Sequence, residues 1–462
     1  MAEPSFAFGT QWHGKCFVCG AISPRYGIAE RLCQQCVDRY RHHKFFREVS
    51  DLAACFVTIV PEPVARVPSE ELNRGFSDLL LRSGKMNQDP GEMLRTVFPN
   101  DLDLPCGQPT LFEDERLARF AGFGRAWTLD LSPYIWSGTL KDLRSWAVLS
   151  VAIEHNINHL AVWTAGNAGF SLAKLVHRWN AAQRNGQAPK TVHCLVDAFA
   201  PPEIVVTLRS LQCRVAPIST GSGAVLLREQ VYHVVSSLAD VGESYWQVTD
   251  GWDGVGVFMY SLLARQCLAL LRAQLGDASG MQDQDLYVVL PVGTGNLLLG
   301  FVEGARQAGG ERCKVVAAVP FGDNMMTPFL PAENEEHHRP QLRRVEPVAP
   351  KLTGFYSPLS PCLWQMTLNR DFSDRRAVEF IAVDRAAQIE AAARVCSPTE
   401  ERTIAAEPSA LIAFGALKQL AQRIREYGER PQQSAVLVVN SGFGIMGAEE
   451  GEFFTKSIFA FR

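Results

Sequence analysis

The sequence predicts an α/β protein with parallel sheets, more than one globular lobe and a small N-terminal zinc ribbon. Three observations support this fold class. The chain has 462 residues, about two to three times the length of a typical domain. Short apolar runs alternate with helical patterns, which is typical of a parallel sheet. Four of the twelve cysteines fall near the N-terminus in two Cys-x2-Cys pairs, the spacing of a zinc ribbon.

Composition and charge limit the function classes. Hydrophobic residues make up 47% of the chain and charged residues 20%, which is close to the average of globular proteins and suffices for a sizeable core. Lys and Arg total 45 against 49 for Asp and Glu, a formal net charge of −4. This balance offers no basic surface for nucleic acid or an anionic membrane. We therefore expect neither as a partner.

The N-terminus and the apolar stretches predict a cytoplasmic protein. The first five residues, Met-Ala-Glu-Pro-Ser, lack the basic and apolar regions of a secretory signal. The longest uncharged stretch, residues 286–302, contains a proline and several glycines and is too short to span a membrane. In this setting most of the cysteines are expected to be reduced.

Residues 1–45 are predicted to form the zinc ribbon. Cys16 and Cys19 make one pair and Cys33 and Cys36 the other, so four thiolates can converge on one zinc ion. A site with four protein ligands is closed, so the metal would stabilise the fold and take no part in catalysis. The alternative is four unliganded core cysteines.

The remaining chain divides into three parts. Residues 46–104 mix short apolar segments with prolines and are predicted to be a connecting region. Residues 105–447 carry the strand and helix alternation and are predicted to be the catalytic region. Within them, residues 328–376 resemble a loop or lid. Residues 448–462 form a C-terminal tail.

Strands are predicted first at residues 161–163 and 192–196, then at 286–290 and 435–439. A helix that contains residues 411–417 is expected to follow the Glu-Pro-Ser-Ala segment at 407–410, which would cap it.

The first chemical motif is Ser-Gly-Thr-Leu-Lys-Asp at residues 137–142, which opens the helical pattern of residues 143–149. It places Lys141 at a helix N-terminus. The positive end of the helix dipole disfavours an ammonium and favours the neutral amine that a Schiff base requires. A lone lysine is otherwise most often a surface charge.

Two glycine-rich turns follow predicted strands and precede helices. Thr-Ala-Gly-Asn-Ala-Gly at residues 164–169 leaves backbone N–H groups for an anion such as a carboxylate, although an ordinary strand-to-helix turn is the alternative. Pro-Val-Gly-Thr-Gly-Asn at 291–296 is suited to a phosphate. It matches neither a Walker A loop nor a dinucleotide fingerprint, so nucleotide binding is disfavoured.

The last motif is Asn-Ser-Gly-Phe-Gly at residues 440–444, after the apolar strand of residues 435–439. It presents the hydroxyl of Ser441 at the carboxyl end of the sheet, where ligands of α/β proteins bind.

Taken in order, these motifs resemble the fold-type II pyridoxal-phosphate enzymes, and among them most closely threonine synthase, some members of which carry a four-cysteine zinc ribbon. The resemblance covers about residues 105–447. It implies a two-lobed fold of the tryptophan synthase β type, with a smaller inserted lobe over about 130–230 and the remainder as a larger lobe. It also implies pyridoxal phosphate (PLP) as cofactor beside the structural zinc, and a homodimer.

The resemblance also implies roles for residues. Lys141 matches the lysine that holds the cofactor as a Schiff base and then transfers protons, Asn167 the residue that hydrogen-bonds its phenolic oxygen, and Ser441 the hydroxyl that faces its pyridine nitrogen. The substrate α-carboxylate would bind at Thr164, Ala165, Gly166 and Ala168. The cofactor phosphate would bind at Gly293, Thr294, Gly295 and Asn296.

Two departures from the threonine synthase pattern bear on the substrate. Leu143 occupies the position two residues after the lysine where an arginine is common, and Arg144 follows it. The segment that would hold a substrate phosphate corresponds to residues 247–254, which contain acidic residues and no arginine. Acidic groups repel a phosphomonoester.

We therefore expect a PLP-dependent lyase or transferase that catalyses β- or γ-elimination or replacement on a small amino acid. A genuine threonine synthase, with a phosphate site built from Arg144, Lys351 or Thr353, is one alternative. A non-catalytic binding protein that keeps the fold is the other.

Overall fold

A computed structural model describes most of the chain beyond residue 109. The described residues are 110–132, 137–154, 157–182, 188–197, 202–218, 245–248, 254–277, 284–308, 312–320, 378–396 and 404–444. The chain divides into two compact units. Unit 1 comprises Met1–Leu104, Lys141–Met259 and Phe355–Asp371; unit 2 comprises Pro105–Leu140, Tyr260–Gly354 and Phe372–Arg462.

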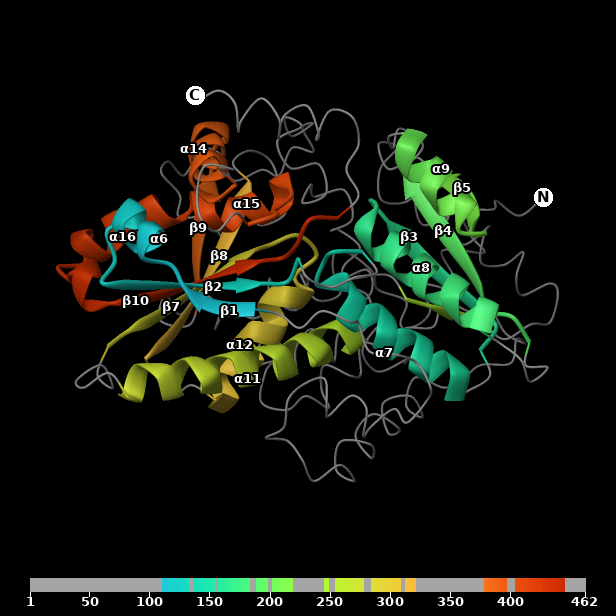
Figure 1. Ribbon diagram of the computed structural model, residues 1–462, viewed down its shortest axis with the longest axis horizontal. Helices are drawn as coiled ribbons and strands as arrows, with labels where there is room; N and C mark the ends of the chain where they lie inside the picture. Colours follow the sequence, from blue (N-terminus) through green and yellow to red (C-terminus); the bar gives the residue numbers. More distant parts are fainter. Residues whose placement is uncertain are drawn as a thin grey trace, which may run out of the picture. The chain divides into compact units, whose positions relative to one another are not determined.

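Unit 2 contains a six-stranded sheet in the order β1-β2-β10-β7-β8-β9 (Figure 1). The strands are β1 (Thr110–Glu113), β2 (Arg125–Asp130), β7 (Leu286–Pro291), β8 (Cys313–Pro320), β9 (Val378–Val383) and β10 (Ala435–Asn440). Every residue of the central strands β7 and β10 is buried. Strands covered on both faces consist of continuous apolar runs, which is why both were predictable.

The edge strand β1 runs antiparallel to β2, whereas all other neighbours in this sheet are parallel. The prediction of a parallel sheet is therefore wrong at this edge. Residues 114–124 join the two strands and include only the short helix α6 (Glu115–Ala121). A parallel crossover requires about a dozen residues or more, so the chain returns alongside the strand it has just left.

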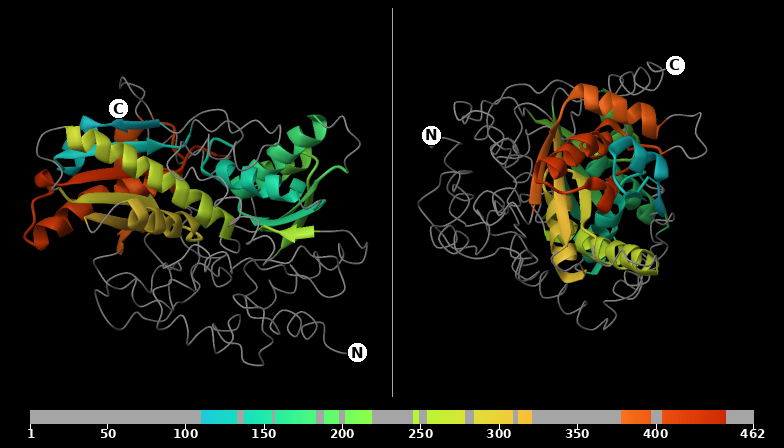
Figure 2. Two further views of the ribbon diagram at one scale, coloured as in Figure 1. Left: turned by 90° about the horizontal axis from the view of Figure 1, so that it is seen from below. Right: turned by 90° about the vertical axis from the view of Figure 1, so that its left-hand side faces the viewer.

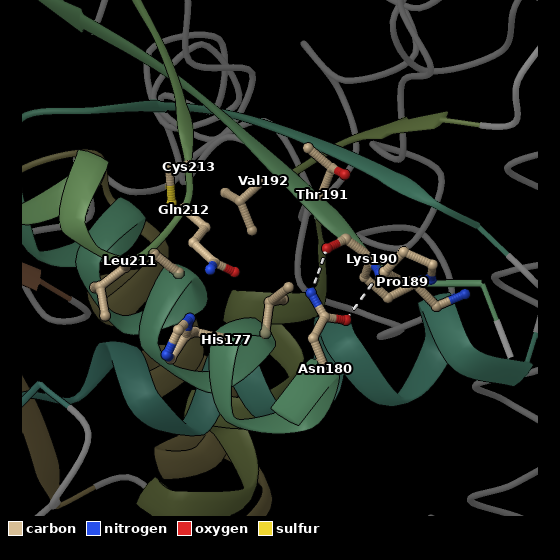
Figure 3. A pocket seen from close by; sticks show the side chains of 11 residues that line it. His177, Asn180, Pro189, Lys190, Thr191, Val192, Leu211, Gln212 and Cys213 are labelled. Atoms are coloured by element: carbon tan, nitrogen blue, oxygen red, sulfur yellow. Dashed lines mark hydrogen bonds between the residues drawn. The ribbon is translucent and has the colours of Figure 1, made fainter. Parts of the chain in front are cut away.

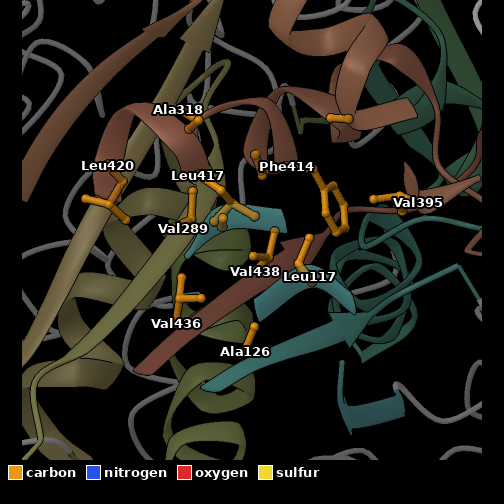
Figure 4. Close-up of a cluster of buried hydrophobic side chains, with 14 of the residues drawn as sticks. Leu117, Ala126, Val289, Ala318, Val395, Phe414, Leu417, Leu420, Val436 and Val438 are labelled. Carbon is orange, nitrogen blue, oxygen red and sulfur yellow. The ribbon is translucent and has the colours of Figure 1, made fainter. Parts of the chain in front are cut away.

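Helices cover both faces of this sheet (Figures 1 and 2). Helix α6 lies on one face with α14 (Arg385–Val395), α15 (Pro408–Gly415), α16 (Leu417–Glu426) and the short 3₁₀ helix η10 (Pro431–Gln433) nearby. Their apolar side chains, such as Leu117, Phe414 and Leu417, form one core with Val289 and Val438 of the sheet (Figure 4). Helices α11 (Gly254–Asp277) and α12 (Asn296–Ala308) lie on the other face.

The helix predicted to contain residues 411–417 is divided in the structure. Helix α15 ends at Gly415 and α16 begins at Leu417. A Cβ at Gly415 would lie 2.6 Å from Val383 Cγ1, so this turn of helix packs closely against neighbouring structure. Glu407 is the N-cap of α15, as expected, but its side chain makes no capping hydrogen bond; Pro408 is the first residue of the helix, a position that proline favours.

Unit 1 contains a four-stranded parallel sheet in the order β5-β4-β3-β6. Its strands are β3 (His159–Thr164), β4 (Thr191–Asp197), β5 (Arg214–Ile218) and β6 (Tyr245–Gln247). Helix α8 (Asn167–Ala182) packs on β3 and β4 between α7 (Lys141–Glu154) and α9 (Pro202–Ser210). The strands predicted within residues 161–163 and 192–196 lie in β3 and β4.

The zinc ribbon lies outside the described residues and stays a prediction, as do the connecting region, the 328–376 segment and the tail. Over the part of the chain that the structure describes, no group of three or more His, Cys, Asp or Glu side chains could hold a metal ion. No helix among the described residues is long and apolar enough to cross a membrane.

Candidate functional site

Lys141 is the first residue of α7, where the sequence predicts a helix N-terminus. The backbone just before Lys141 is hydrogen-bonded to the backbone of the C-terminal motif at residues 440–444. The Leu140 N–H donates to the Ser441 carbonyl oxygen at 3.0 Å, and the Phe443 N–H donates to the Gly138 carbonyl oxygen at 2.8 Å. The backbone directly before the lysine is therefore held by the turn that carries the predicted serine.

Two glycines allow this contact. Gly138 has a φ of +69° and Gly442 a φ of +123°, conformations that side chains rarely adopt. A Cβ at Gly442 would overlap the Gly138 carbonyl oxygen and lie 2.6 Å from the Thr139 Cα. A Cβ at Gly138 would lie 2.8 Å from the Phe443 carbonyl oxygen. The glycines of two distant motifs thus permit one close backbone crossing.

The side chain of Asn440 holds the Ser441 turn in place. Asn440 is completely buried, and its Nδ2 donates to Asp130 Oδ1 and to the Ala405 carbonyl oxygen, each at 2.8 Å. Its Oδ1 accepts the Gly442 N–H at 3.2 Å. Asn440 belongs to the last sequence motif but was given no role there, and Asp130 was not predicted as a site residue. Both are polar residues that end apolar strands, and that shared position is the signal that could have identified them.

The turn after β3 has its own internal bracing. Thr164 Oγ1 accepts the N–H of Gly166 at 3.0 Å and that of Gly169 at 2.9 Å. The Thr164 hydroxyl thus shapes the turn and caps the Gly169 N–H in the first turn of α8, and the Phe170 N–H donates to the Gly166 carbonyl oxygen at 2.9 Å. Helix N-termini of this kind bind carboxylates.

A buried hydrogen bond ties this turn to the lysine helix. Ser171 in α8 donates through Oγ to Asp142 Oδ1 at 2.6 Å, and its Oγ lies 2.8 Å from Ser145 Oγ. All three side chains are fully buried. Because Asp142 directly follows Lys141, the lysine and the 164–168 turn lie at the same end of the α7 and α8 pair. Asp142 was part of the first motif, but sequence reasoning gave it no role.

The turn predicted to hold a phosphate follows β7 in unit 2. Gly295 has a φ of +95°, and its carbonyl oxygen accepts the Leu299 N–H at 2.9 Å, so the turn continues directly into α12. Asn296 begins that helix and is buried. A glycine turn that opens a helix presents backbone N–H groups to an anion.

Arg144, which the sequence analysis considers as a phosphate ligand, is completely buried in α7. Its guanidinium donates to the Val248 carbonyl oxygen at the end of β6. This contact links the lysine helix to the end of the strand.

The predicted residues divide between the two units. Unit 1 brings together Lys141 and the turn that contains Thr164, Ala165, Gly166, Asn167 and Ala168. Unit 2 contains Ser441 and the turn with Gly293, Thr294, Gly295 and Asn296. The predicted zinc ligands Cys16, Cys19, Cys33 and Cys36 lie outside the described residues, as do Lys351 and Thr353.

A family model described as "Pyridoxal-phosphate dependent enzyme" matches residues 128–442. The crystal structure of a PLP-dependent aspartate racemase is similar with a TM-score of 0.55 at 15% identity, over 74% of this chain and 92% of that one. The structure of Escherichia coli diaminopropionate ammonia lyase in apo form is similar with a TM-score of 0.53 at 13% identity, over 82% and 92%. No curated protein matches the chain.

The donor groups of the described residues fit pyridoxal phosphate. The cofactor requires an amine for its aldehyde, a donor for its phenolic oxygen, N–H groups for its phosphate and a partner for its ring nitrogen. Lys141 and Asn167 of unit 1, and the 293–296 turn and Ser441 of unit 2, are the residues that would supply these groups, in that order. Gly295, in the turn predicted to bind the phosphate, has a positive φ in which a side chain would be strained.

Proposed function

The chain belongs to the family of pyridoxal-phosphate dependent enzymes, and we propose that it catalyses elimination or replacement at Cβ or Cγ of a small amino acid. The observation that carries the proposal is the Ser171–Asp142 hydrogen bond, which keeps the lysine and the carboxylate-binding turn at one end of the α7 and α8 pair. When bound, the cofactor supplies an electron sink for the negative charge that develops at the substrate α-carbon.

In this proposal the residues of the chain bind and orient the substrate and transfer its protons. The N–H groups at the start of α8 bind the α-carboxylate of the substrate and so fix its α-carbon. Lys141 holds the cofactor through Nζ; once released, the neutral Nζ takes the α-proton and later returns a proton to the product. Asn167 donates to the phenolic oxygen, and the 293–296 turn retains the phosphate.

Ser441 favours this reaction type over transamination. Its side chain is a neutral hydroxyl, and its backbone is fixed by Leu140 and by the Asn440 network. A neutral partner at the ring nitrogen need not protonate the ring, whereas a carboxylate does. The electron sink is then weaker, and loss of a leaving group from the side chain competes well with reprotonation on the cofactor.

The substrate is proposed to be an amino acid with an uncharged or amine leaving group. Both similar structures are named for reactions of amino acids, a racemase and an ammonia lyase. Phosphohomoserine, the substrate of a genuine threonine synthase, is less well supported because Arg144 is buried and bound to Val248. A homodimeric state and a cytoplasmic location remain parts of the proposal.

The test is the visible absorbance of the full-length protein loaded with pyridoxal phosphate, titrated with serine, homoserine, diaminopropionate and their phospho- and acetyl-esters where these exist. One of these substrates should change the spectrum and release a keto acid or form a substituted amino acid. Lys141→Ala should reduce turnover by at least about 10³-fold, because it removes both the anchor and the base.

Lys418→Ala is the matched control. Lys418 is half exposed on α16, and within the described residues its ion pair is with Glu390. It should retain full turnover. Turnover by Lys141→Ala at the rate of the unmodified protein would rule out the proposed mechanism, and an unchanged spectrum with every amino acid would rule out the enzyme assignment.

A further inference from the structure

The Ser441 hydroxyl is a buried polar group that makes no hydrogen bond within the described residues. Ser441 is 7% exposed and directly follows β10, at the carboxyl end of the sheet in unit 2. Buried polar groups are nearly always paired. A hydroxyl left unpaired at this end of an α/β sheet is therefore available to a ligand.

The backbone of the Ser441 turn is held by other segments of unit 2. Its three successive carbonyl oxygens, from residue 440 to residue 442, each accept a backbone N–H, at 3.1, 3.0 and 3.0 Å in that order; the donors are Leu131, Leu140 and Glu407. The surroundings of Ser441, and not its own side chain, thus determine where the turn lies.

Two polar side chains fix the same turn. Asn440 and Asp130 are opposite each other in the parallel register of β10 and β2, and Asn440 Nδ2 donates to Asp130 Oδ1 at 2.8 Å. The same carboxylate oxygen accepts the Ser132 N–H at 2.9 Å. Asn440 also donates to the Ala405 carbonyl oxygen, and its Oδ1 accepts the Gly442 N–H. One amide thus links the end of β2, the chain before α15 and the turn.

This network requires an amide at residue 440. The nitrogen of the side chain faces two acceptors, its oxygen faces one donor, and the side chain is completely buried. Asparagine is the shortest side chain that offers two donors and an acceptor. Because buried partners left unpaired are costly, loss of one member disturbs the whole network.

We propose that Asn440 and Asp130 are positioning residues that set where the Ser441 hydroxyl lies, and thereby its hydrogen bond to the ring nitrogen of the cofactor. The role of Ser441 at the ring nitrogen rests on the proposed function. Neither Asn440 nor Asp130 touches the cofactor in this arrangement, and both act through the turn. Loss of either should therefore weaken the same hydrogen bond that Ser441→Ala removes.

Asn180 of unit 1 offers a matched comparison. Its Nδ2 donates to the Lys190 carbonyl oxygen at 2.7 Å, and its Oδ1 accepts the Lys190 N–H at 2.9 Å. Figure 3 shows both bonds at the wall of a pocket that α8 forms with the start of β4. Asn180 lies near the opposite end of α8 from Asn167. Its loss should therefore lower stability without affecting the cofactor.

The experiment measures binding of pyridoxal phosphate to the full-length protein in the absence of any amino acid. Fluorescence quenching gives the Kd, and the visible absorbance of the bound cofactor reports the surroundings of its ring. Ser441→Ala should weaken binding by about 3- to 10-fold, which is the contribution of one hydrogen bond, and shift the absorbance. Asn440→Ala and Asp130→Ala should shift the absorbance in the same direction and weaken binding by no more than Ser441→Ala does.

A double-mutant cycle separates positioning from a general loss of structure. If Asn440 acts through Ser441, adding Asn440→Ala to Ser441→Ala should weaken binding by less than about twofold more. Asp130→Asn keeps an acceptor oxygen for the Asn440 amide, so it should bind and absorb as the unmodified protein does. Asn180→Ala should lower the midpoint of urea unfolding and leave both cofactor measurements unchanged.

Losses from Asn440→Ala and Ser441→Ala that multiply in the double variant would overturn the proposal, as would equal binding by Asp130→Ala and the unmodified protein. The two Asp130 variants decide the matter if Asn440→Ala does not fold. An unmodified protein that binds no cofactor would overturn both this proposal and the proposed function. A protein that shows these effects but converts no amino acid would contradict the proposed function alone.

Discussion

The motif that leads to Lys141 and the motif that contains Ser441 each depend on one glycine, Gly138 and Gly442, and the backbones of these two glycines are in contact. Gly138 and Gly442 both have positive φ values, and each leaves room for a carbonyl or Cα of the other strand. The isolated bridge between Thr139 and Gly442 records the same contact. A side chain at either position would meet backbone atoms, which cannot move as the end of a flexible side chain can.

Gly442→Ala should therefore destabilise the protein by about 2–4 kcal/mol, because the new Cβ is strained in φ and overlaps the Gly138 carbonyl. Urea unfolding measures the change. Gly428→Ala is the control, since Gly428 has a φ of +79° but nothing within 4 Å of the added Cβ. It should cost only about 1 kcal/mol. Equal losses in the two variants would show that the close crossing contributes nothing.

For single residues, the sequence predicted where a residue lies in its helix or strand better than it predicted the contacts that hold the residue in place. Lys141 and Ser441 were both predicted from local pattern, since a helix start and a strand end are readable from neighbouring residues. Asn440 and Asp130 were not, because their role depends on a pairing between strands about 300 residues apart in sequence. No local pattern reports such a partner.

Among the elements, α7 and α8 are the pair that positions the proposed base and the carboxylate turn. The Ser171 hydroxyl donates to the buried carboxylate of Asp142, and hydrogen bonds to charged groups are the stronger kind. Loss of this hydrogen bond should therefore alter how the N-terminal ends of α7 and α8 are aligned with each other.

Ser171→Ala should lower the free energy of unfolding by about 1–3 kcal/mol and raise the KM for the amino-acid substrate more than it lowers kcat. Urea unfolding and steady-state kinetics measure these quantities. Ser150→Ala is the control: Ser150 is equally buried, but its hydroxyl donates to Trp146 within the same helix. That variant should cost less than about 1 kcal/mol and leave KM unchanged. A KM effect of similar size in both would contradict a positioning role for Ser171.

Element boundaries show where local reasoning stops. The run of helix formers from Leu411 to Leu417 predicts one helix, yet the structure breaks it after Gly415, where the backbone packs against Val383. Likewise β1 was not among the predicted strands, and its antiparallel direction depends on the length of the connection to β2. Packing partners and connection lengths decided both.

For the whole molecule, the order of motifs carried more information than any one of them. The family match spans residues 128–442 and thus includes residues of both units. The chain passes from one unit to the other several times, and strand β10 returns near the C-terminus to pair with β2 and β7. The resemblance of the motifs implies two lobes, and the strand and helix alternation predicts parallel sheets, but the alternation does not specify which late strand completes which sheet.

Unit 2 should lose stability in alkaline solution. Burial raises the pKa of Tyr287, Cys267, Cys313 and Cys396 to about 12, from ordinary values of 10.0 for tyrosine and 9.0 for cysteine. In the unfolded chain these groups lose their protons near their ordinary pKa, while in the folded protein they keep them. The unfolded state therefore binds fewer protons as pH rises, and alkali favours it.

Each such group should reduce the free energy of unfolding by about 1.4 kcal/mol per pH unit between its two pKa values, with no contribution below about pH 8. Urea unfolding at pH 7, 8, 9 and 10 measures the slope. Cys396→Ala, which has no thiol to titrate, should be less steep above pH 9 by the share of one group, whatever its effect at pH 7. An unchanged slope would mean that the Cys396 thiol has the same pKa in the folded and the unfolded chain, which would contradict a pKa raised by burial.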